Sequence, residues 1–221
     1  MCVLEVLMEL SGSQLGMECL RALWYEANGA DKVEISESTR RIFDMGNALE
    51  AVAVKWMKRE GKDVFYNQKA HGDPPDFALE LGEKRVGRIV GRFDAIVNKN
   101  TLIDIKACGD RLFLDIVDRA EKGIEPPHDY WVQLNVYFFG LKMGCLRDDI
   151  ASLVSGLEKV GLYAIHRGTG ESIELIRKPD VEVFQHVVEK ALKVFSAESV
   201  EELEMDKSKC NWCRFREVCK R

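Results

Sequence analysis

The sequence contains no hydrophobic run long enough to cross a membrane, no internal repeat and no low-complexity tract. Its first ten residues are apolar, but Glu5 and Glu9 interrupt them and a basic start is missing, so a secretory signal is not expected. The pattern G-x-x-x-x-G-K-[ST] is also missing, which excludes a P-loop motor within this chain. The lack of a membrane span and of a secretory signal favours a cytoplasmic protein without membrane contact. The lack of a P-loop means that any helicase must be a partner protein.

Size and composition favour a single domain spanning residues 1–221. Hydrophobic residues make up 46% of the chain and charged residues 31%, which suits a sizeable core under a charged surface. The formal net charge is -5, so a surface that is basic throughout is excluded. Any nucleic-acid-binding region must therefore be a local basic patch on an acidic body.

Hydrophobic periodicity and turn residues predict a mixture of helices and strands. Helices are expected at residues 11–27, 38–60, 112–121, 126–142 and 180 to about 205. Short strands are expected at 64–67 and 77–81, and hairpins at 87–97 with 101–108 and at 160–167 with 171–178. Because the strands lie between helices, the expected fold class is α/β or α+β, with a mixed central sheet flanked by helices.

Two aspartates are expected to face each other in the first hairpin. With a turn at 98–100, counting back along both strands sets Asp94 opposite Asp104 and Arg92 opposite Lys106. Directly opposed carboxylates repel, so they need a cation. Lys106 shares a strand face with Asp104, and a hard divalent ion such as Mg²⁺ or Mn²⁺ takes oxygen ligands. The alternative is that Asp104 and Lys106 lie on a solvated face of the sheet.

Two of the expected helices carry polar side chains in informative positions. Glu50 lies within the apolar arc of the second helix, where a carboxylate is costly unless it is paired or bound to a metal. Gly46, one turn earlier, leaves space beside it. Gln133 and Tyr137 share one face of the fourth helix. The alternatives are that Glu50 pairs with a buried Arg or Lys, and that Gln133 and Tyr137 are packing residues.

Four short motifs occur in order along the chain: GNALE at 46–50, GRFD at 91–94, DIK at 104–106 and QLNVY at 133–137. Together they resemble the active-site motifs of the PD-(D/E)XK nuclease superfamily, and more narrowly its RecB-like branch. The resemblance covers most of the chain and implies a restriction-endonuclease-like core from about 38 to 180. Two positions depart from the family pattern: Phe93 replaces the proline, and Glu50 replaces the histidine common among iron-sulfur members.

The resemblance implies a metal-dependent DNA exonuclease that hydrolyses phosphodiester bonds to 5′-phosphate and 3′-hydroxyl products. Mg²⁺ or Mn²⁺ would be held by Glu50, Asp94, Asp104 and the backbone carbonyl of Ile105. Lys106 would position the attacking water or stabilise developing negative charge. The remaining implied site residues, Gln133 and Tyr137, would orient Lys106 and the DNA backbone. Single-stranded DNA or DNA ends are the expected substrates.

Seven cysteines are present, and an odd number in such a chain argues against a disulfide framework. Three form a C-x2-C-x5-C pattern at the C-terminus, and with one upstream cysteine they resemble the iron-sulfur clasp of AddB-type and CRISPR-associated exonucleases. The four implied ligands are Cys19, Cys210, Cys213 and Cys219. A 4Fe-4S cluster would then join residues 11–30 and 181–221 into one subdomain. A four-cysteine zinc site is the alternative. The remaining cysteines, expected to be unliganded, are Cys2, Cys108 and Cys145.

The segment 207–221 is the strongest candidate for local DNA contact, because basic and aromatic residues alternate in it. The candidate DNA-binding residues are Lys207, Lys209, Trp212, Arg214 and Arg216. The expected setting is recombination, repair, phage replication or CRISPR adaptation, with a helicase, a recombinase or a CRISPR integrase as partner. Two alternatives remain open: a non-catalytic iron-sulfur subunit that binds DNA or assembles a larger complex, and a zinc-stapled protein whose DIK triplet is incidental.

Overall fold

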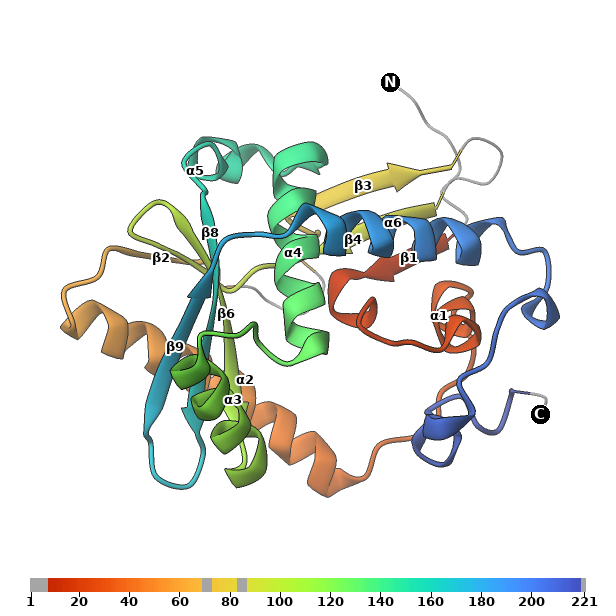
Figure 1. Cartoon of the computed structure of the whole chain (residues 1–221), viewed down its shortest axis with the longest axis horizontal. Helices are drawn as coiled ribbons and strands as arrows, with labels where there is room; N and C mark the ends of the chain where they lie inside the picture. Colours follow the sequence, from red (N-terminus) through yellow and green to blue (C-terminus); the bar gives the residue numbers. More distant parts are fainter. Residues whose placement is uncertain (1–7, 69–72, 83–86, 220–221) are drawn as a thin grey trace.

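The computed structural model describes residues 8–68, 73–82 and 87–219 of the chain (Figure 1). Its helices are α1 (Leu20–Ala27), α2 (Glu37–Arg59), α3 (Asp110–Lys122), α4 (His128–Met143), α5 (Ala151–Val154) and α6 (Val181–Ser196). Its short 3-10 helices are η1 (Gly12–Gln14), η2 (Asp148–Ile150), η3 (Val200–Glu202) and η4 (Lys207–Trp212). No helix within these ranges has the length and apolar character needed to span a membrane.

The strands form two mixed sheets rather than the single central sheet expected from the sequence. One sheet has the order β1 (Met8–Ser11), β4 (Gly87–Gly91), β3 (Phe77–Leu81) and β7 (Cys145–Leu146). The other has the order β2 (Val64–Tyr66), β5 (Ala95–Val97), β6 (Thr101–Cys108), β8 (Lys159–His166) and β9 (Ser172–Arg177). Two pairs, β1 with β4 and β6 with β8, are parallel, and the other pairs are antiparallel. The mixed α/β class is confirmed.

Helix α4 lies between the two sheets (Figure 1). It contacts β3 and β4 of one sheet and β6 and β8 of the other, and α6 packs against it as well. Ten of its residues are buried, from Trp131 to Leu141, because neighbours cover it on several sides. A helix covered in this way is apolar around most of its circumference, and the sequence of α4 has this pattern. The core therefore continues from one sheet through α4 to the other.

The first hairpin is partly as expected. Its turn is confirmed: Asn98 and Lys99 adopt left-handed backbone angles, with φ of 49° and 62°, and Val97 pairs with Thr101. The prediction of one strand over 87–97 is wrong, because β4 ends at Gly91 and β5 begins in the other sheet. Arg92 therefore does not pair with Lys106, and its guanidinium instead donates to the backbone carbonyl of Asp73.

The ends of the chain also differ from the prediction. The expected helix over 11–27 is replaced by β1, η1 and a shorter α1 that begins after Cys19. Part of this difference follows from the close approach of Gly12 to α4. A Cβ at Gly12 would lie 2.6 Å from Cε1 of Tyr137. The last long helix ends at Ser196 rather than near 205, because the backbone becomes extended at Ala197.

Candidate active site

Strand β6 carries Asp104 and Lys106 on one face and Ile103 and Ile105 on the other. Ile103 and Ile105 are buried in a cluster with Ala53 of α2, as alternation along the strand requires. The Lys106 Nζ lies 2.9 Å from Oδ2 and 3.2 Å from Oδ1 of Asp104. The structure therefore brings the carboxylate and the ammonium into direct contact.

Asp104 is almost fully buried, with 2% of its surface exposed. Gln133 of α4 donates a hydrogen bond from Nε2 to Asp104 Oδ1 at 2.8 Å. Among the described residues, Asp104 Oδ2 accepts no hydrogen bond of good geometry, although Lys106 Nζ is close to it. Burial raises the pKa of Asp104, and the Lys106 ammonium opposes this shift. One oxygen of a buried carboxylate is thus left with lone pairs available.

Asp94 lies next to Asp104, as the hairpin register predicts. Ala95 pairs with Ile103, and Asp94 is the residue before Ala95. The Asp94 Oδ2 accepts a hydrogen bond from the Ile105 backbone N–H at 2.7 Å, which fixes the side chain against β6. Burial raises the pKa of Asp94 well above its usual range, and the Asp104 carboxylate raises it further.

Glu50 is carried by α2, which packs across β6. Burial raises the pKa of Glu50, while Lys106 lowers it and Asp104 raises it. Glu50 in turn raises the pKa of Asp94, so all three carboxylates lie within each other's electrostatic field. Glu50 is half-buried and makes no hydrogen bond or ion pair with another described residue. Helix α2, the residue before β5 and strand β6 thus bring three carboxylates together beside Lys106.

Tyr137 is buried beneath this group, with 4% of its surface exposed. Its ring packs edge-on against Phe77, with centroids 6.1 Å apart, in space left by Gly12 and Gly91. Burial raises the Tyr137 pKa, the Asp104 carboxylate raises it further, and a hydrogen bond with Gln133 opposes the shift. The structure therefore links Tyr137 to the site through Gln133 and through charge.

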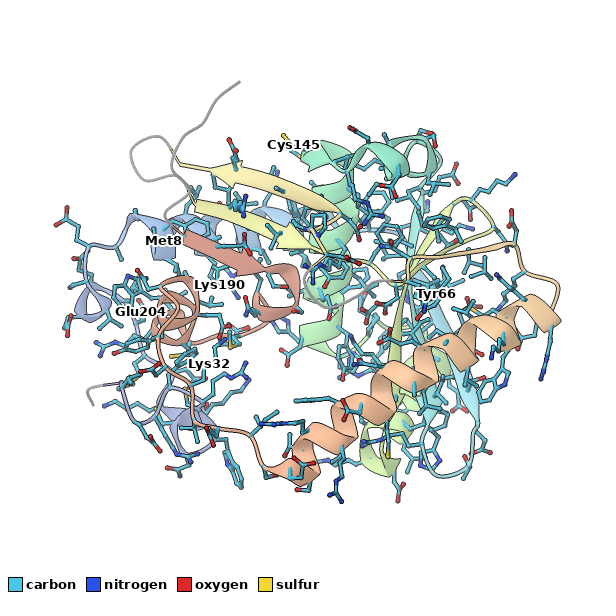
Figure 2. All side chains as sticks on the ribbon, turned by 180° about the vertical axis from the view of Figure 1, so that it is seen from behind. Met8, Lys32, Tyr66, Cys145, Lys190 and Glu204 are labelled. Carbon is cyan, nitrogen blue, oxygen red and sulfur yellow. The ribbon has the colours of Figure 1, made fainter. Side chains whose placement is uncertain are left out.

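Two tyrosines near the site were not predicted from the sequence. The Lys106 Nζ lies 5.5 Å from the ring centroid of Tyr130, within the range of a cation–π interaction. Tyr130 precedes Gln133 by three residues on α4, a helical spacing that would have pointed to it. Tyr66 lies at the end of β2, which packs against α2 (Figure 2). Burial raises its pKa, and Glu50 and Asp94 raise it further.

A separate cavity of about 620 Å³ is lined by all four predicted cluster ligands. They are Cys19, Cys210, Cys213 and Cys219, all free thiols. Burial raises the pKa of Cys219, Arg21 lowers it, and the other three thiols raise it. No group of three or more His, Cys, Asp or Glu side chains in the described ranges is arranged around a single metal ion. The cysteines nevertheless gather in one place from opposite ends of the chain.

Contacts other than the thiols already join the two ends of the chain. The rings of Tyr25 and Phe215 stack with centroids 5.7 Å apart, and the Tyr25 hydroxyl donates to the Val218 carbonyl at 3.2 Å. Arg21 Nε donates to the Leu203 carbonyl at 2.8 Å. Lys32 lies beside this C-terminal segment, 6.0 Å from the Phe215 ring (Figure 2). Helix α1 therefore packs directly on the cysteine-bearing segment.

The structure also shows where the other cysteines and the candidate DNA-binding residues lie. Of the cysteines expected to be unliganded, Cys108 is buried in β6, Cys145 is exposed in β7, and Cys2 lies outside the described residues. The candidate DNA-binding residues Lys207, Lys209, Trp212, Arg214 and Arg216 are all exposed. Four of them, all except Lys207, line the cysteine cavity, and the exposed fraction of Trp212 is 89%. Residues 220 and 221 lie outside the described ranges.

The family model of the PD-(D/E)XK nuclease superfamily matches residues 7–220. The chain belongs to this superfamily. A comparison with curated proteins found no match. Among solved structures, this superfamily member is similar to the protein SSO0001, with 19% sequence identity, a TM-score of 0.54, and coverage of 99% of this chain and 88% of that chain.

Two exonuclease structures are also similar. The alkaline exonuclease LHK-Exo from Laribacter hongkongensis has a TM-score of 0.51 at 14% identity, covering 96% of this chain and 95% of that chain. LHK-Exo has also been solved in complex with dAMP. A phage-related exonuclease from Haemophilus somnus 129PT has a TM-score of 0.51 at 14% identity, covering 85% of this chain and 93% of that chain. At these identities the likeness shows the fold of the superfamily.

The donor set of this PD-(D/E)XK chain suits a hard divalent ion. Members of the superfamily generally use Mg²⁺ or Mn²⁺. Carboxylate oxygens are the ligands that these ions prefer. The Asp104 Oδ2 without a hydrogen bond and the unpaired Glu50 carboxylate both offer free lone pairs within the described part of the chain. The donor chemistry of these residues therefore fits such an ion, although their side chains are not gathered around one ion position within the described ranges.

Proposed function

We propose that this protein is a Mg²⁺- or Mn²⁺-dependent DNA exonuclease that hydrolyses phosphodiester bonds in single-stranded DNA or at DNA ends. The observation that carries the proposal is the convergence of Glu50, Asp94 and Asp104 beside Lys106 in a chain of this superfamily. The similarity to an alkaline exonuclease and to a phage-related exonuclease supports the choice of reaction. The dAMP complex of LHK-Exo supports DNA as the substrate.

The three carboxylates, with the Ile105 backbone carbonyl, would hold one or two divalent ions. When bound, such an ion supplies an activated water and polarises the scissile phosphate. The chain contributes a preorganised set of ligands: Gln133 fixes one oxygen of Asp104, and the Ile105 N–H fixes one oxygen of Asp94. The other oxygen of Asp94 stays available to the ion, and Asp104 Oδ2 has the Lys106 ammonium beside it but no hydrogen bond of good geometry among the described residues.

Lys106 remains charged in this site because Asp104 and Asp94 raise its pKa more than burial lowers it. Its ammonium can donate hydrogen bonds to a phosphate oxygen or to the attacking water, and it stabilises the negative charge that develops in the transition state. The Tyr130 ring below Nζ limits the positions that the ammonium can occupy. Gln133 and Tyr137 orient Lys106 indirectly, through Asp104.

We further propose that the four cysteines hold a 4Fe-4S cluster. The support for this proposal is that all four cysteines, drawn from both ends of the chain, line one cavity, and that their spacing resembles the clasp of the iron-sulfur exonucleases. The cluster would stabilise the packing of α1 on the C-terminal segment. Anaerobic purification tests this proposal: a brown protein containing iron and sulfide supports the cluster, whereas a colourless protein that retains only zinc refutes it.

The exposed basic residues beside this cavity are proposed to contact DNA. Their positive charges would neutralise phosphates, and the exposed Trp212 would stack on an unpaired base. Recombination, repair, phage replication and CRISPR adaptation are the proposed settings. A helicase, a recombinase or a CRISPR integrase is the proposed kind of partner.

The experiment that tests the proposed function follows the degradation of end-labelled single-stranded DNA in Mg²⁺, in Mn²⁺ and in EDTA. The wild type is compared with Asp104→Asn, which removes the most buried ligand. Asp118→Asn is the matched control, because Asp118 is an exposed aspartate of α3 paired with Lys122. Metal-dependent degradation by the wild type and the control, lost in Asp104→Asn, supports the proposal. Equal activity of all three proteins, or activity in EDTA, refutes it.

A further inference from the structure

The residues between β4 and β5 leave one sheet and enter the other. Gly91 ends β4, and Asp94 directly precedes β5. The backbone groups of this link are not all satisfied by strand pairing, and buried N–H and C=O groups need hydrogen-bond partners from elsewhere. Phe93, in the middle of the link, is buried, with 2% of its surface exposed. The side chains that hydrogen-bond to the backbone of this link therefore also determine where Asp94 lies.

Asp76 and Asn67 supply these partners. The Asp76 N–H donates to the Gly91 carbonyl at 2.8 Å, and its Oδ2 accepts the Phe93 N–H at 3.0 Å. The Asn67 Nδ2 donates to the Phe93 carbonyl at 2.9 Å. The Asn67 backbone N–H donates to the Asp94 carbonyl at 2.9 Å. The N–H and carbonyl of Phe93 and the carbonyl of Asp94 are therefore all fixed by hydrogen bonds.

The two residues also hold each other, and Arg147 completes the network. The Asn67 Nδ2 donates to Asp76 Oδ2 at 2.7 Å. The Arg147 Nη1 lies 3.2 Å from Asp76 Oδ1, and its Nη2 donates to Asn67 Oδ1 at 3.3 Å. Asp76 is fully buried and Asn67 is 7% exposed. A buried carboxylate needs a cation and hydrogen bonds, and here it has both.

We propose that Asp76 and Asn67 are positioning residues that act through the backbone of 91–94 to set the Asp94 carboxylate where a divalent ion binds. The proposal rests on the metal-dependent function proposed above. The bond from the Ile105 N–H to Asp94 Oδ2, 2.7 Å long, determines which Asp94 oxygen remains for the ion. A shift of the link would weaken that bond and redirect the free oxygen.

Two substitutions test the network at different points. Asp76→Asn keeps the side-chain shape but removes the negative charge that pairs with Arg147. Its amide nitrogen also brings a second donor close to groups that already donate, the Asn67 amide and the Phe93 N–H. Asn67→Ala removes the donor to the Phe93 carbonyl and leaves Asp76 paired with Arg147. Calorimetric titration with Mn²⁺ alone measures ion affinity without DNA. We expect each variant to bind Mn²⁺ about 10-fold more weakly than the wild type, the size of effect seen when partners of metal ligands are removed.

The half-saturating Mn²⁺ concentration for DNA degradation should rise by the same factor, while DNA affinity in EDTA stays unchanged. Asp118→Asn is the control, because Asp118 is an exposed aspartate of α3 that pairs with Lys122 outside this network. A folded variant that is less stable but retains wild-type Mn²⁺ affinity overturns the positioning role. If Asp76→Asn does not fold, the Mn²⁺ affinity of Asn67→Ala alone tests that role. A wild type that binds no Mn²⁺ overturns the proposed function itself.

Discussion

The contact between Lys106 and Asp104 yields the most quantitative prediction. Lys106→Met keeps the length of the side chain but removes the charge 2.9 Å from Asp104 Oδ2. Two opposite charges about 4 Å apart attract by roughly 4 kcal/mol at an effective dielectric constant near 20. Removing one member of a buried pair costs about 3–5 kcal/mol, because the partner is left buried without compensation. The Lys106 side chain keeps 28% exposure, so we expect the lower end, about 3 kcal/mol.

The loss should depend on pH and on divalent ions. Without Lys106, the pKa values of Asp94 and Asp104 in the folded protein rise further above those in the unfolded chain. The folded protein then binds protons more tightly, so stability falls as the pH rises through these folded-state values. In EDTA, the destabilisation should therefore be largest at about pH 8 and should shrink toward about pH 4, where unfolded carboxylates also take up protons.

Urea unfolding in EDTA measures the stability, and degradation of labelled single-stranded DNA in Mg²⁺ measures the activity. We expect the Lys106→Met rate to fall by at least about 100-fold, the usual effect of removing one preorganised electrostatic group. Lys122→Met is the control, since Lys122 forms an exposed ion pair with Asp118, and its loss should cost no more than about 0.5 kcal/mol. A Lys106→Met protein with wild-type stability and rate would show that Lys106 neither compensates the buried Asp104 nor takes part in the reaction.

Three further predictions concern other parts of the chain. Cys213→Ser should lower the iron and sulfide content of anaerobically purified protein and its melting temperature, and an unchanged metal content would exclude Cys213 as a ligand. Trp212→Ala should leave stability within about 0.5 kcal/mol, because Trp212 is 89% exposed, but weaken single-stranded DNA binding by about 1–3 kcal/mol in fluorescence titrations; unchanged affinity would remove the stacking role. Gly91→Ala should destabilise the fold by about 1–3 kcal/mol in urea, because its Cβ would lie 2.4 Å from Cε1 of Phe77, and wild-type stability would show that the ring can move.

Much of the fold could be predicted because local signals agreed with tertiary structure. The helix α2 shows helical periodicity; it begins at Glu37, one residue before the expected start, because Ser36 caps it by accepting the Thr39 N–H at 3.2 Å. The left-handed turn at Asn98 and Lys99 fixed the register of the first hairpin. The division into two sheets could not be predicted, because 87–97 reads as one continuous strand. The interruption depends on Asp76 and Asn67, whose partners come from distant segments.

The candidate site was predictable where chemistry and periodicity coincide. Asp104 and Lys106 share a strand face by alternation, and Glu50 is conspicuous as a carboxylate in an apolar arc. Tyr66 was not predictable, because only the pairing of β2 with β5 brings it near Asp94. The gathering of four thiols in one cavity followed from the family resemblance, since no local pattern brings Cys19 to the C-terminal segment.

We propose above that three carboxylates from α2, the β4–β5 link and β6 hold a divalent ion beside Lys106. The most direct test is an anomalous difference map from crystals grown with Mn²⁺, recorded near the manganese absorption edge. We expect a peak bounded by Glu50, Asp94 and Asp104, with the Ile105 carbonyl as a further ligand. A fully occupied Mn²⁺ site elsewhere, with these carboxylates unliganded, would contradict it.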